Sequence, residues 1–441
     1  MLDDALLDDP VALRRADTGG ALLALAGAGA RIRNALRLAE EAGLSRLRPD
    51  GRPRTVLVAG HRSALTAGEM LAAIGSTGCP VLLLGPVAAA NDEEGPAPGF
   101  LLDLGWRLPG WVGSLDLLVT ASADGREPGL CALVEQAYLR GCSAAVIAPE
   151  GSPLAEAAVQ ARALPLPCAP PSPGLPDAES ATRPGPESAL PPEDPAALWA
   201  ILTPLLALAG RIGIAAVDDR SLQAAADRLD EVAVRCRPDA GAYLNPGKSL
   251  VGHLSGALPL LWGDDTLTGA VARRFAALLA ARAGQPALTG MLPQALAAHR
   301  GLFATRLGDG TDTGDFFRDR VDEPDPLRLR VLLMRRIMST EPVNAVDADR
   351  PEAPGQGAGR PGAGGGPSAA RDLDAAALNR TVARAQRLAE DHGVGLNEIA
   401  SAHTDPVEAL AELVGLTDFA AVYLGLTTGT GPGPGPTGRI H

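Results

Sequence analysis

Short apolar runs alternate with segments of helical periodicity along most of the chain. Residues 55–60 form an apolar run of strand length, Ser63 begins a helical pattern that continues to Ile74, and residues 80–84 are apolar again. This order predicts a strand, a helix and a second strand. Such units build parallel sheets that are covered by helices and bind ligands at the carboxyl ends of their strands.

A second unit of the same kind follows. Residues 115–120 are apolar, Pro128 stands at the start of a helical pattern that reaches Gly141, and residues 143–148 are apolar. Another helical segment begins at Ser152. A helical pattern over residues 22–44 precedes both units, so the first part of the chain is predicted to be one α/β domain.

The second half repeats the alternation less regularly. Helices are predicted near residues 199–208, 221–236, 250–257, 275–279, 374–392 and 405–425, and strands at 258–262 and 327–334. We therefore expect the α/β class, with two parallel-sheet domains and flanking helices.

Two segments interrupt the pattern. Residues 169–196 are rich in proline and are predicted to be an interdomain linker, and residues 346–371 are nearly all Pro, Gly, Ala and charge, which predicts a disordered insertion. The expected domains are therefore 1–168 and 197–427, with a flexible tail at 428–441.

The composition argues against two classes of binding partner, nucleic acids and membranes. The net charge of −13 over 441 residues argues against nucleic acid, and the longest apolar stretch, 198–217, is cut by Pro204 and Arg211, which argues against a membrane span. The five cysteines lack CxxC spacing and lie mostly in apolar runs. Free thiols in a reducing cytoplasm explain them.

Hydroxyl groups follow two of the predicted strands. Thr120 and Ser122, with Gly125, lie between a strand and a helix, and Ser63 lies at the corresponding turn of the first unit. Helix amino termini favour anions, so these residues predict a phosphate site. The alternative for each is an ordinary capping hydroxyl.

Other chemistry is not supported. A glycine pair at 27–29 lies inside a helical pattern, and the segment 241–249 has the wrong spacing for a Walker loop. The histidines show no metal-binding spacing, and no GxSxG elbow is present. We expect neither metal nor cofactor. His61, beside Ser63, is either a loop histidine or an acid.

The order of segments resembles the bifunctional phosphoglucose/phosphomannose isomerases, which have two sugar isomerase (SIS) domains. The segment 120–125 resembles that family's Ser-Tyr-Ser-Gly-Asn-Thr phosphate loop, and 59–63 loosely matches its Gly-Met-Gly-Gly-Ser turn. Closer matches are Asn245-Pro-Gly-Lys248 and Asp418-Phe-Ala-Ala-Val-Tyr423. The resemblance implies a cytoplasmic homodimer that binds a hexose phosphate through Ser63, Thr120, Ser122 and Gly125.

The catalytic positions of that family are not preserved. Its glutamate aligns with Ala280-Ala281 and its histidine with Ala297, although a shift of two residues would bring His299 into place. The arginine of its Ser-Gly-Gly-Arg turn is missing from residues 149–153. The catalytic residues are therefore unknown, and His299 and His61 are the candidates. Three hypotheses remain: an aldose–ketose isomerase, a catalytically silent sugar-phosphate sensor, and a scaffold without a ligand.

Overall fold

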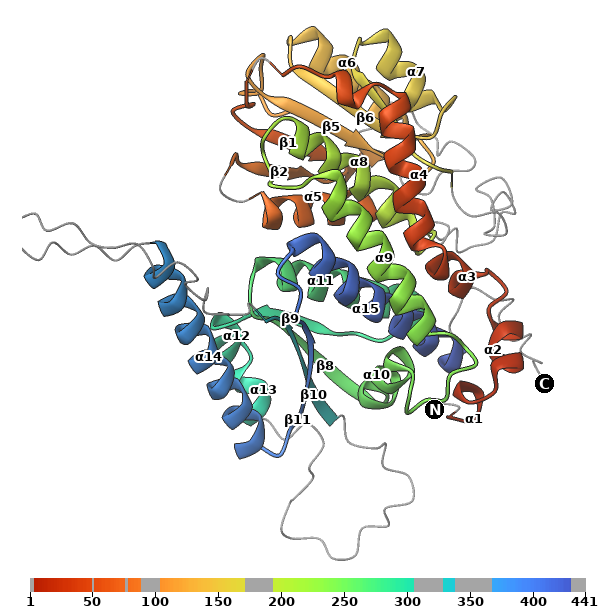
Figure 1. Cartoon of the computed structure of the whole chain (residues 1–441), viewed down its shortest axis with the longest axis vertical. Helices are drawn as coiled ribbons and strands as arrows, with labels where there is room; N and C mark the ends of the chain where they lie inside the picture. The colour runs from red at the N-terminus through yellow and green to blue at the C-terminus, as the bar shows by residue number, and fades with distance from the viewer. Residues whose placement is uncertain are drawn as a thin grey trace, which may run out of the picture.

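The computed structural model describes residues 4–49, 51–75, 78–88, 104–170, 193–304, 328–337 and 367–429. Over these residues the chain is α/β, with two parallel sheets that are flanked by helices (Figure 1). The α/β class and the parallel pairing are therefore confirmed. A short antiparallel pair, β3 (Val87–Ala88) with β4 (Leu104–Gly105), lies outside both sheets.

The first sheet has the order β2-β1-β5-β6-β7 within the described residues, and all of its pairings are parallel. Its strands are β1 (Val56–Ala59), β2 (Val81–Leu84), β5 (Leu117–Ala121), β6 (Ser143–Ala148) and β7 (Leu164–Pro167). Alternate residues face opposite sides: Leu57 and Leu118 pack with α6 (Pro128–Leu139) and α7 (Pro153–Gln160), while Val58 and Val119 face the larger core.

The second sheet has the order β11-β10-β8-β9 in the described part of the chain and is also parallel. Its strands are β8 (Ala257–Gly263), β9 (Leu288–Met291), β10 (Arg328–Arg336) and β11 (Gly395–Ser401). The accompanying helices are α10 (Pro246–Leu254), α11 (Thr266–Ala283), α12 (Gln294–Ala298), α13 (Arg300–Ala304), α14 (Pro367–Asp391) and α15 (Pro406–Thr428). In Figure 1, α14 lies at the side of this sheet, near α12 and α13.

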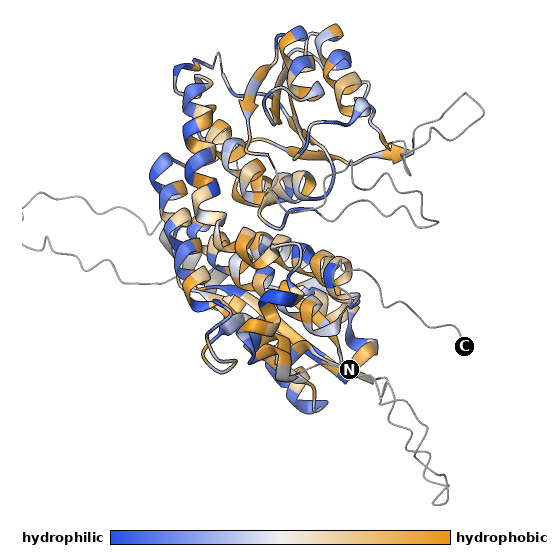
Figure 2. Ribbon diagram, turned by 90° about the vertical axis from the view of Figure 1, so that its right-hand side faces the viewer, coloured by the Kyte–Doolittle hydropathy of each residue, from blue (hydrophilic) through white to orange (hydrophobic). Residues whose placement is uncertain are grey.

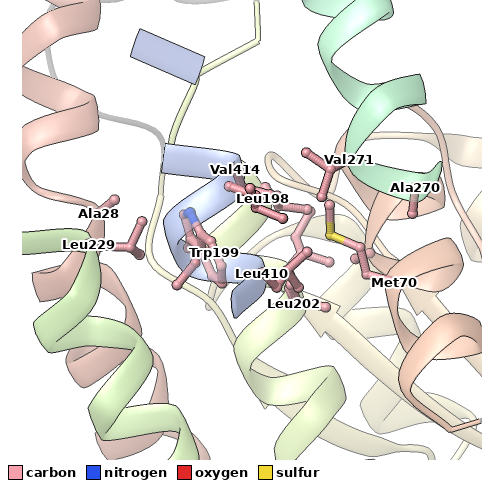
Figure 3. Packing of buried hydrophobic residues seen from close by; sticks show 14 of the residues in the cluster. Ala28, Met70, Leu198, Trp199, Leu202, Leu229, Ala270, Val271, Leu410 and Val414 are labelled. Carbon is pink, nitrogen blue, oxygen red and sulfur yellow. The ribbon is translucent and has the colours of Figure 1, made fainter. Parts of the chain in front are cut away.

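A layer of helices joins the two sheets. It comprises α4 (Ala28–Glu41), α5 (Ser63–Ile74), α8 (Ala197–Arg211), α9 (Asp219–Arg235), α11 and α15, preceded by α1 (Asp4–Leu7), α2 (Pro10–Ala16) and α3 (Ala21–Ala26). Figure 2 shows the hydrophobic residues concentrated on the strands and on the helices between the two lobes. The largest of the hydrophobic clusters spans both domains, and in it Trp199 and Leu202 of α8 lie near Leu410 and Val414 of α15 (Figure 3).

The helix α15 is long and apolar enough to cross a membrane by length and composition, with a mean hydropathy of 1.5 over its most apolar window. However, 89% of that window is buried inside the fold. It packs against α9, α10 and α11, so α15 is the core helix of the second domain.

Most predicted elements are present, with corrections. The helix predicted over 22–44 is two helices, because the chain turns at Gly27 between α3 and α4. The short helix α12 and the strands β7, β9 and β11 lie in segments where the hydrophobic pattern predicted no element. The prediction of disorder is wrong for residues 367–371, which begin α14, and the rest of 346–371 lies outside the described residues.

The predicted linker is described only at its two ends, 169–170 and 193–196. The second of these ends is buried between the domains. The helix that follows it, α8, packs against α4 and α5 of the first domain. The chain returns to the first sheet before it enters the second.

Candidate functional site

The order of strands in the first sheet reverses between β1 and β5. From β1 the chain moves to β2 on one side, whereas β5 is followed by β6 and β7 on the other. Ligands of open α/β sheets bind at such a switch point, outside the carboxyl ends of the strands. The segments that leave these two ends are residues 60–63 and 120–125, which are the two turns selected from the sequence.

The amino terminus of α5 holds a carboxylate. The backbone N–H of Ser63 donates to Glu193 Oε1 at 3.3 Å, and Ser63 Oγ donates to Glu193 Oε2 at 2.9 Å. Burial raises the pKa of Glu193, against the hydrogen bond from Ser63 and the charges of Arg274 and Arg62. A carboxyl group thus occupies the helix end that was predicted to bind an anion.

The turn before Ser63 has a backbone that favours glycine. Arg62 has φ 49° and ψ −119°, although it is not glycine. In the aligned Gly-Met-Gly-Gly-Ser turn this position is glycine. Gly60 also permits a close approach, since a Cβ there would lie 2.5 Å from the carbonyl oxygen of Ala121 on the neighbouring strand. The two turns therefore meet at the backbone level.

The second turn is closed by its own side chain. Ser122 Oγ accepts from the backbone N–H of Gly125 at 2.8 Å and of Asp124 at 3.3 Å, and donates to Asp124 Oδ1 at 3.1 Å. The backbone N–H of Arg126 donates to Asp124 Oδ1 at 3.2 Å. The backbone amides of this predicted phosphate loop therefore have partners within the loop, and a ligand would have to replace these hydrogen bonds.

Thr120 differs from Ser122. It lies on β5 opposite Ala59 of β1, is fully buried, and its Oγ1 has no hydrogen-bond partner among the described residues. A buried hydroxyl without a partner is uncommon and costs stability. Of the predicted phosphate ligands, Thr120 is the one whose hydrogen-bonding capacity is unused.

A histidine–carboxylate pair lies at the same edge. His61 Nε2 and Glu127 Oε1 are 2.6 Å apart, and His61 Nδ1 and Glu127 Oε2 have no partners in the described part of the chain. Trp106 lies beside His61, with ring centroids 6.5 Å apart, and its Nε1 donates to the carbonyl oxygens of Gly60 and Leu84.

The two members of this pair shift each other's pKa. Burial lowers the pKa of His61, but the hydrogen bond and charge of Glu127 outweigh it, and the net pKa is raised. For Glu127, burial raises the pKa, but the hydrogen bond and charge of His61 lower it, and the net pKa is lowered. The pair therefore favours a protonated imidazole beside a carboxylate.

The other catalytic candidate, His299, lies with the second sheet. Trp262 of β8 donates its Nε1 proton to His299 Nδ1 at 2.8 Å, and the two rings stack at 6.0 Å. Burial lowers the pKa of His299, which keeps Nδ1 available as an acceptor. The structure therefore groups His61 with Ser63, Thr120 and Ser122, and places His299 against Trp262.

The second sheet has its own switch point, between β8 and β10. Its strand ends carry opposite charges that pair with each other: Arg335 with Asp264 at 3.4 Å, and Arg336 with Asp265 at 3.1 Å. Burial, with the charge of Asp265, raises the pKa of Asp264 to about 6. Internal ion pairs occupy the edge at which a ligand of this sheet would bind.

The matched residues of the second domain hold the fold together. Asn245 caps α10, and Lys248 Nζ donates to the carbonyl oxygens of Pro238 and Ala240. Tyr423 donates to the carbonyl oxygen of Cys236 at 2.6 Å, and Asp418 forms a buried ion pair with Arg274 at 2.7 Å. These contacts give each of these residues a structural role.

No cluster of three metal-ligating side chains occurs within the described residues. A cavity of about 510 Å³ lies between α4, α8 and α9, lined among others by Leu36, Glu40, Arg211 and Asp218. None of its lining residues belongs to the β1–β5 edge, so it is separate from the candidate site.

Comparison with known families identifies the second domain. Residues 244–350 and 370–437 match the family of bacterial phospho-glucose isomerase C-terminal SIS domains. The C-terminal domain is thus similar to an SIS domain. Its parallel sheet and flanking helices agree with that assignment, and the resemblance seen in the sequence is confirmed. No curated protein matches the chain.

Solved structures extend the similarity beyond the SIS domain. A hypothetical protein of Thermus thermophilus matches with a TM-score of 0.55 and 17% identity, over 96% of this chain and 89% of its own. At this identity the similarity shows a shared fold, and it covers both sheets.

Weaker matches include the C-terminal domain of glucosamine-fructose-6-phosphate aminotransferase of Francisella tularensis, with a TM-score of 0.47, 10% identity and coverage of 93% and 96%. A glucose-6-phosphate isomerase like protein of Thermus thermophilus matches with a TM-score of 0.40, 17% identity and coverage of 89% and 87%.

Proposed function

We propose that this protein binds a hexose phosphate, such as glucose or mannose 6-phosphate, at the β1–β5 edge of its first sheet. The observation that carries the proposal is the carboxylate at Ser63, because it marks this helix end as an anion-binding position. The unused hydroxyl of Thr120 at the same edge supplies a further donor. The SIS family of the second domain supports a sugar phosphate as the anion.

The same edge carries groups for acid–base chemistry. Aldose–ketose isomerisation needs a base that moves a proton between neighbouring carbons and an acid that opens the ring. His61 and Glu127 are the ionisable pair beside Ser63, and each keeps one polar atom without a described partner. We therefore propose isomerisation of the bound hexose phosphate by a cytoplasmic homodimer as the enzymatic form of this function.

The alternative is a catalytically silent sugar-phosphate sensor. It is favoured by the alanines at 280, 281 and 297, where the resemblance expects catalytic side chains, and by the engagement of His299 with Trp262. A silent protein would bind the ligand without converting it.

Turnover and binding separate these possibilities. The purified protein is incubated with fructose 6-phosphate, and separately with mannose 6-phosphate, while sugar interconversion and the melting temperature are recorded. Turnover supports the isomerase, and a raised melting temperature without turnover supports the sensor. If neither is observed, the binding proposal fails and the scaffold hypothesis stands.

Variants locate the site. Ser63→Ala removes the hydroxyl donor and should reduce the ligand-induced rise in melting temperature, whereas Ser143→Ala, at an exposed position at the opposite end of β6, should leave it unchanged. Ser122→Ala is a poorer probe, because Ser122 also holds the turn through Gly125 and Asp124.

A further inference from the structure

The residues before α8 form a segment that three arginines hold in place. Arg282 donates to the carbonyl oxygen of Glu193 at 2.7 Å, Arg31 pairs with Asp194 at 2.6 Å, and Arg274 donates to the carbonyl oxygen of Pro195 at 3.2 Å. Arg31 belongs to α4, and the other two belong to α11. The backbone of residues 193–195 is therefore fixed by contacts from both domains.

The Glu193 side chain is attached to this fixed backbone by freely rotatable bonds. Within the described residues, its carboxylate accepts two hydrogen bonds from Ser63, one from the backbone N–H and one from Oγ. These are the two donors that an α5-bound phosphate would need. A phosphate oxygen and the Glu193 carboxylate cannot occupy the same position, so binding requires an exchange.

The exchange is favourable on chemical grounds. A phosphate monoester carries more negative charge than a carboxylate and has three acceptor oxygens, so it gains more from the helix end. A donor that Glu193 leaves unused lies at the same edge. Thr120, on the neighbouring strand β5 opposite Ala59, is fully buried, and its Oγ1 has no partner among the described residues.

We propose that Glu193 is an internal occupant of the phosphate position, and that a hexose phosphate binds by displacing its side chain. This inference rests on the proposed function, and it means that competition from the Glu193 carboxylate limits the affinity of the site for phosphate. The Pro-rich segment 171–192 leads directly into Glu193. The residue that fills the site is thus placed between this Pro-rich segment and α8.

The test is a calorimetric titration of the full-length protein with fructose 6-phosphate and, separately, with inorganic phosphate. Glu193→Ala removes the competing carboxylate and should tighten the binding of both by at least about tenfold, or 1.4 kcal/mol. Glu193→Gln, which keeps the size but loses the charge, should tighten it to a smaller extent and guards against loss of folding in the alanine variant. Glu135→Ala removes an exposed charge from α6 and should leave the affinity unchanged.

The outcomes separate this inference from the site itself. If the wild type binds, Ser63→Ala weakens this binding and neither Glu193 variant tightens it, the site stands but the displacement of the Glu193 side chain is overturned. If Glu193→Ala tightens binding and Glu193→Ala with Ser63→Ala loses it, both stand. If neither the wild type nor a folded Glu193 variant binds either probe, both are overturned.

Discussion

At the scale of single residues, Thr120 allows binding and stability to be tested separately. Its buried hydroxyl has no described partner, so Thr120→Val removes an unsatisfied polar group at almost constant volume. We expect the variant to be as stable as the wild type or more stable by up to about 1 kcal/mol, with weaker binding of fructose 6-phosphate. Denaturant unfolding and titration measure the two effects. A loss of stability with unchanged binding would show that the hydroxyl is structural.

The His61–Glu127 pair predicts a pH dependence. The folded pKa of His61 is raised, so the pair contributes stability fully below the ordinary histidine value of 6.5 and loses it as pH rises through the folded pKa. Glu127→Gln should therefore lower the unfolding free energy by about 1–3 kcal/mol at pH 6 and by less at pH 9. The melting temperatures at the two pH values measure this difference.

Glu127 itself does not titrate in this range, because its lowered pKa lies below the ordinary value of 4.5. The control is Glu135→Gln, at an exposed position of α6, the helix that Glu127 precedes, and its effect should not depend on pH. An effect of Glu127→Gln that is equal at both pH values would mean that His61 is not charged in the folded protein.

Sequence reasoning selected the hydroxyls of the candidate site but not its carboxylates. Ser63 and Thr120 stand at recognisable strand ends, and position along a motif was enough to select them. Glu193 belongs to a Pro-rich segment with no pattern of its own, and only the fold brings it to Ser63, 130 positions away in the sequence. Glu127 precedes Pro128 and looks like an ordinary helix start. Its contact with His61 also depends on the pairing of β1 with β5.

At the scale of elements, the turn after β5 depends on Gly125. This residue has φ +67°, and a Cβ there would lie 2.3 Å from Ser152 Oγ, which caps α7. Gly125→Ala therefore combines backbone strain with a steric clash and should destabilise the protein by about 2–4 kcal/mol.

Gly141 provides a matched comparison, since it has φ +66° and a Cβ there would meet nothing within 4 Å. Gly141→Ala should cost only the backbone strain, about 1 kcal/mol. Unfolding free energies from denaturant titrations test the difference between the two variants. Equal losses would show that the turn can move away from Ser152.

The elements themselves were predictable where the pattern was regular. β6 and the start of α5 fall where the apolar run and Ser63 predicted them. β7 was missed because two of its residues, Pro165 and Pro167, are prolines, which an edge strand tolerates. β11 was missed because its sequence is largely polar, and only its parallel pairing with β10 shows that it is a strand.

At the scale of the whole molecule, a buried ion pair joins α11 to α15. Arg274 and Asp418 expose only 5% and 1% of their side chains, and Arg274 also holds the segment before α8. Asp418→Asn leaves a buried guanidinium without its counter-charge and should cost about 3–5 kcal/mol of unfolding free energy.

The exposed pair between Arg33 and Asp227 serves as the control. Asp227→Asn should cost less than about 1 kcal/mol, because water already solvates both groups. A loss for Asp418→Asn as small as the control's would mean that the second domain is not held by this pair.

The arrangement of the two sheets could not be predicted from the sequence. Periodicity identified helices such as α8 but not their partners, and the expected boundary at 197 assigned α8 to the second domain. In the structure α8 packs against α4 and α5, and a single core continues through both domains. The hydrophobic pattern also does not distinguish the carboxyl ends of β1 and β5 from those of β8 and β10. Only the observed contacts show that the β8–β10 edge is filled by ion pairs.

A crystal structure of the Glu193→Ala protein with fructose 6-phosphate tests the proposed site most directly. We predict the phosphate at the amino terminus of α5, with oxygens within hydrogen-bond distance of Ser63 N, Ser63 Oγ and Thr120 Oγ1. A sugar phosphate bound instead at the β8–β10 edge or in the cavity between α4, α8 and α9, with the Ser63 position empty, would contradict it.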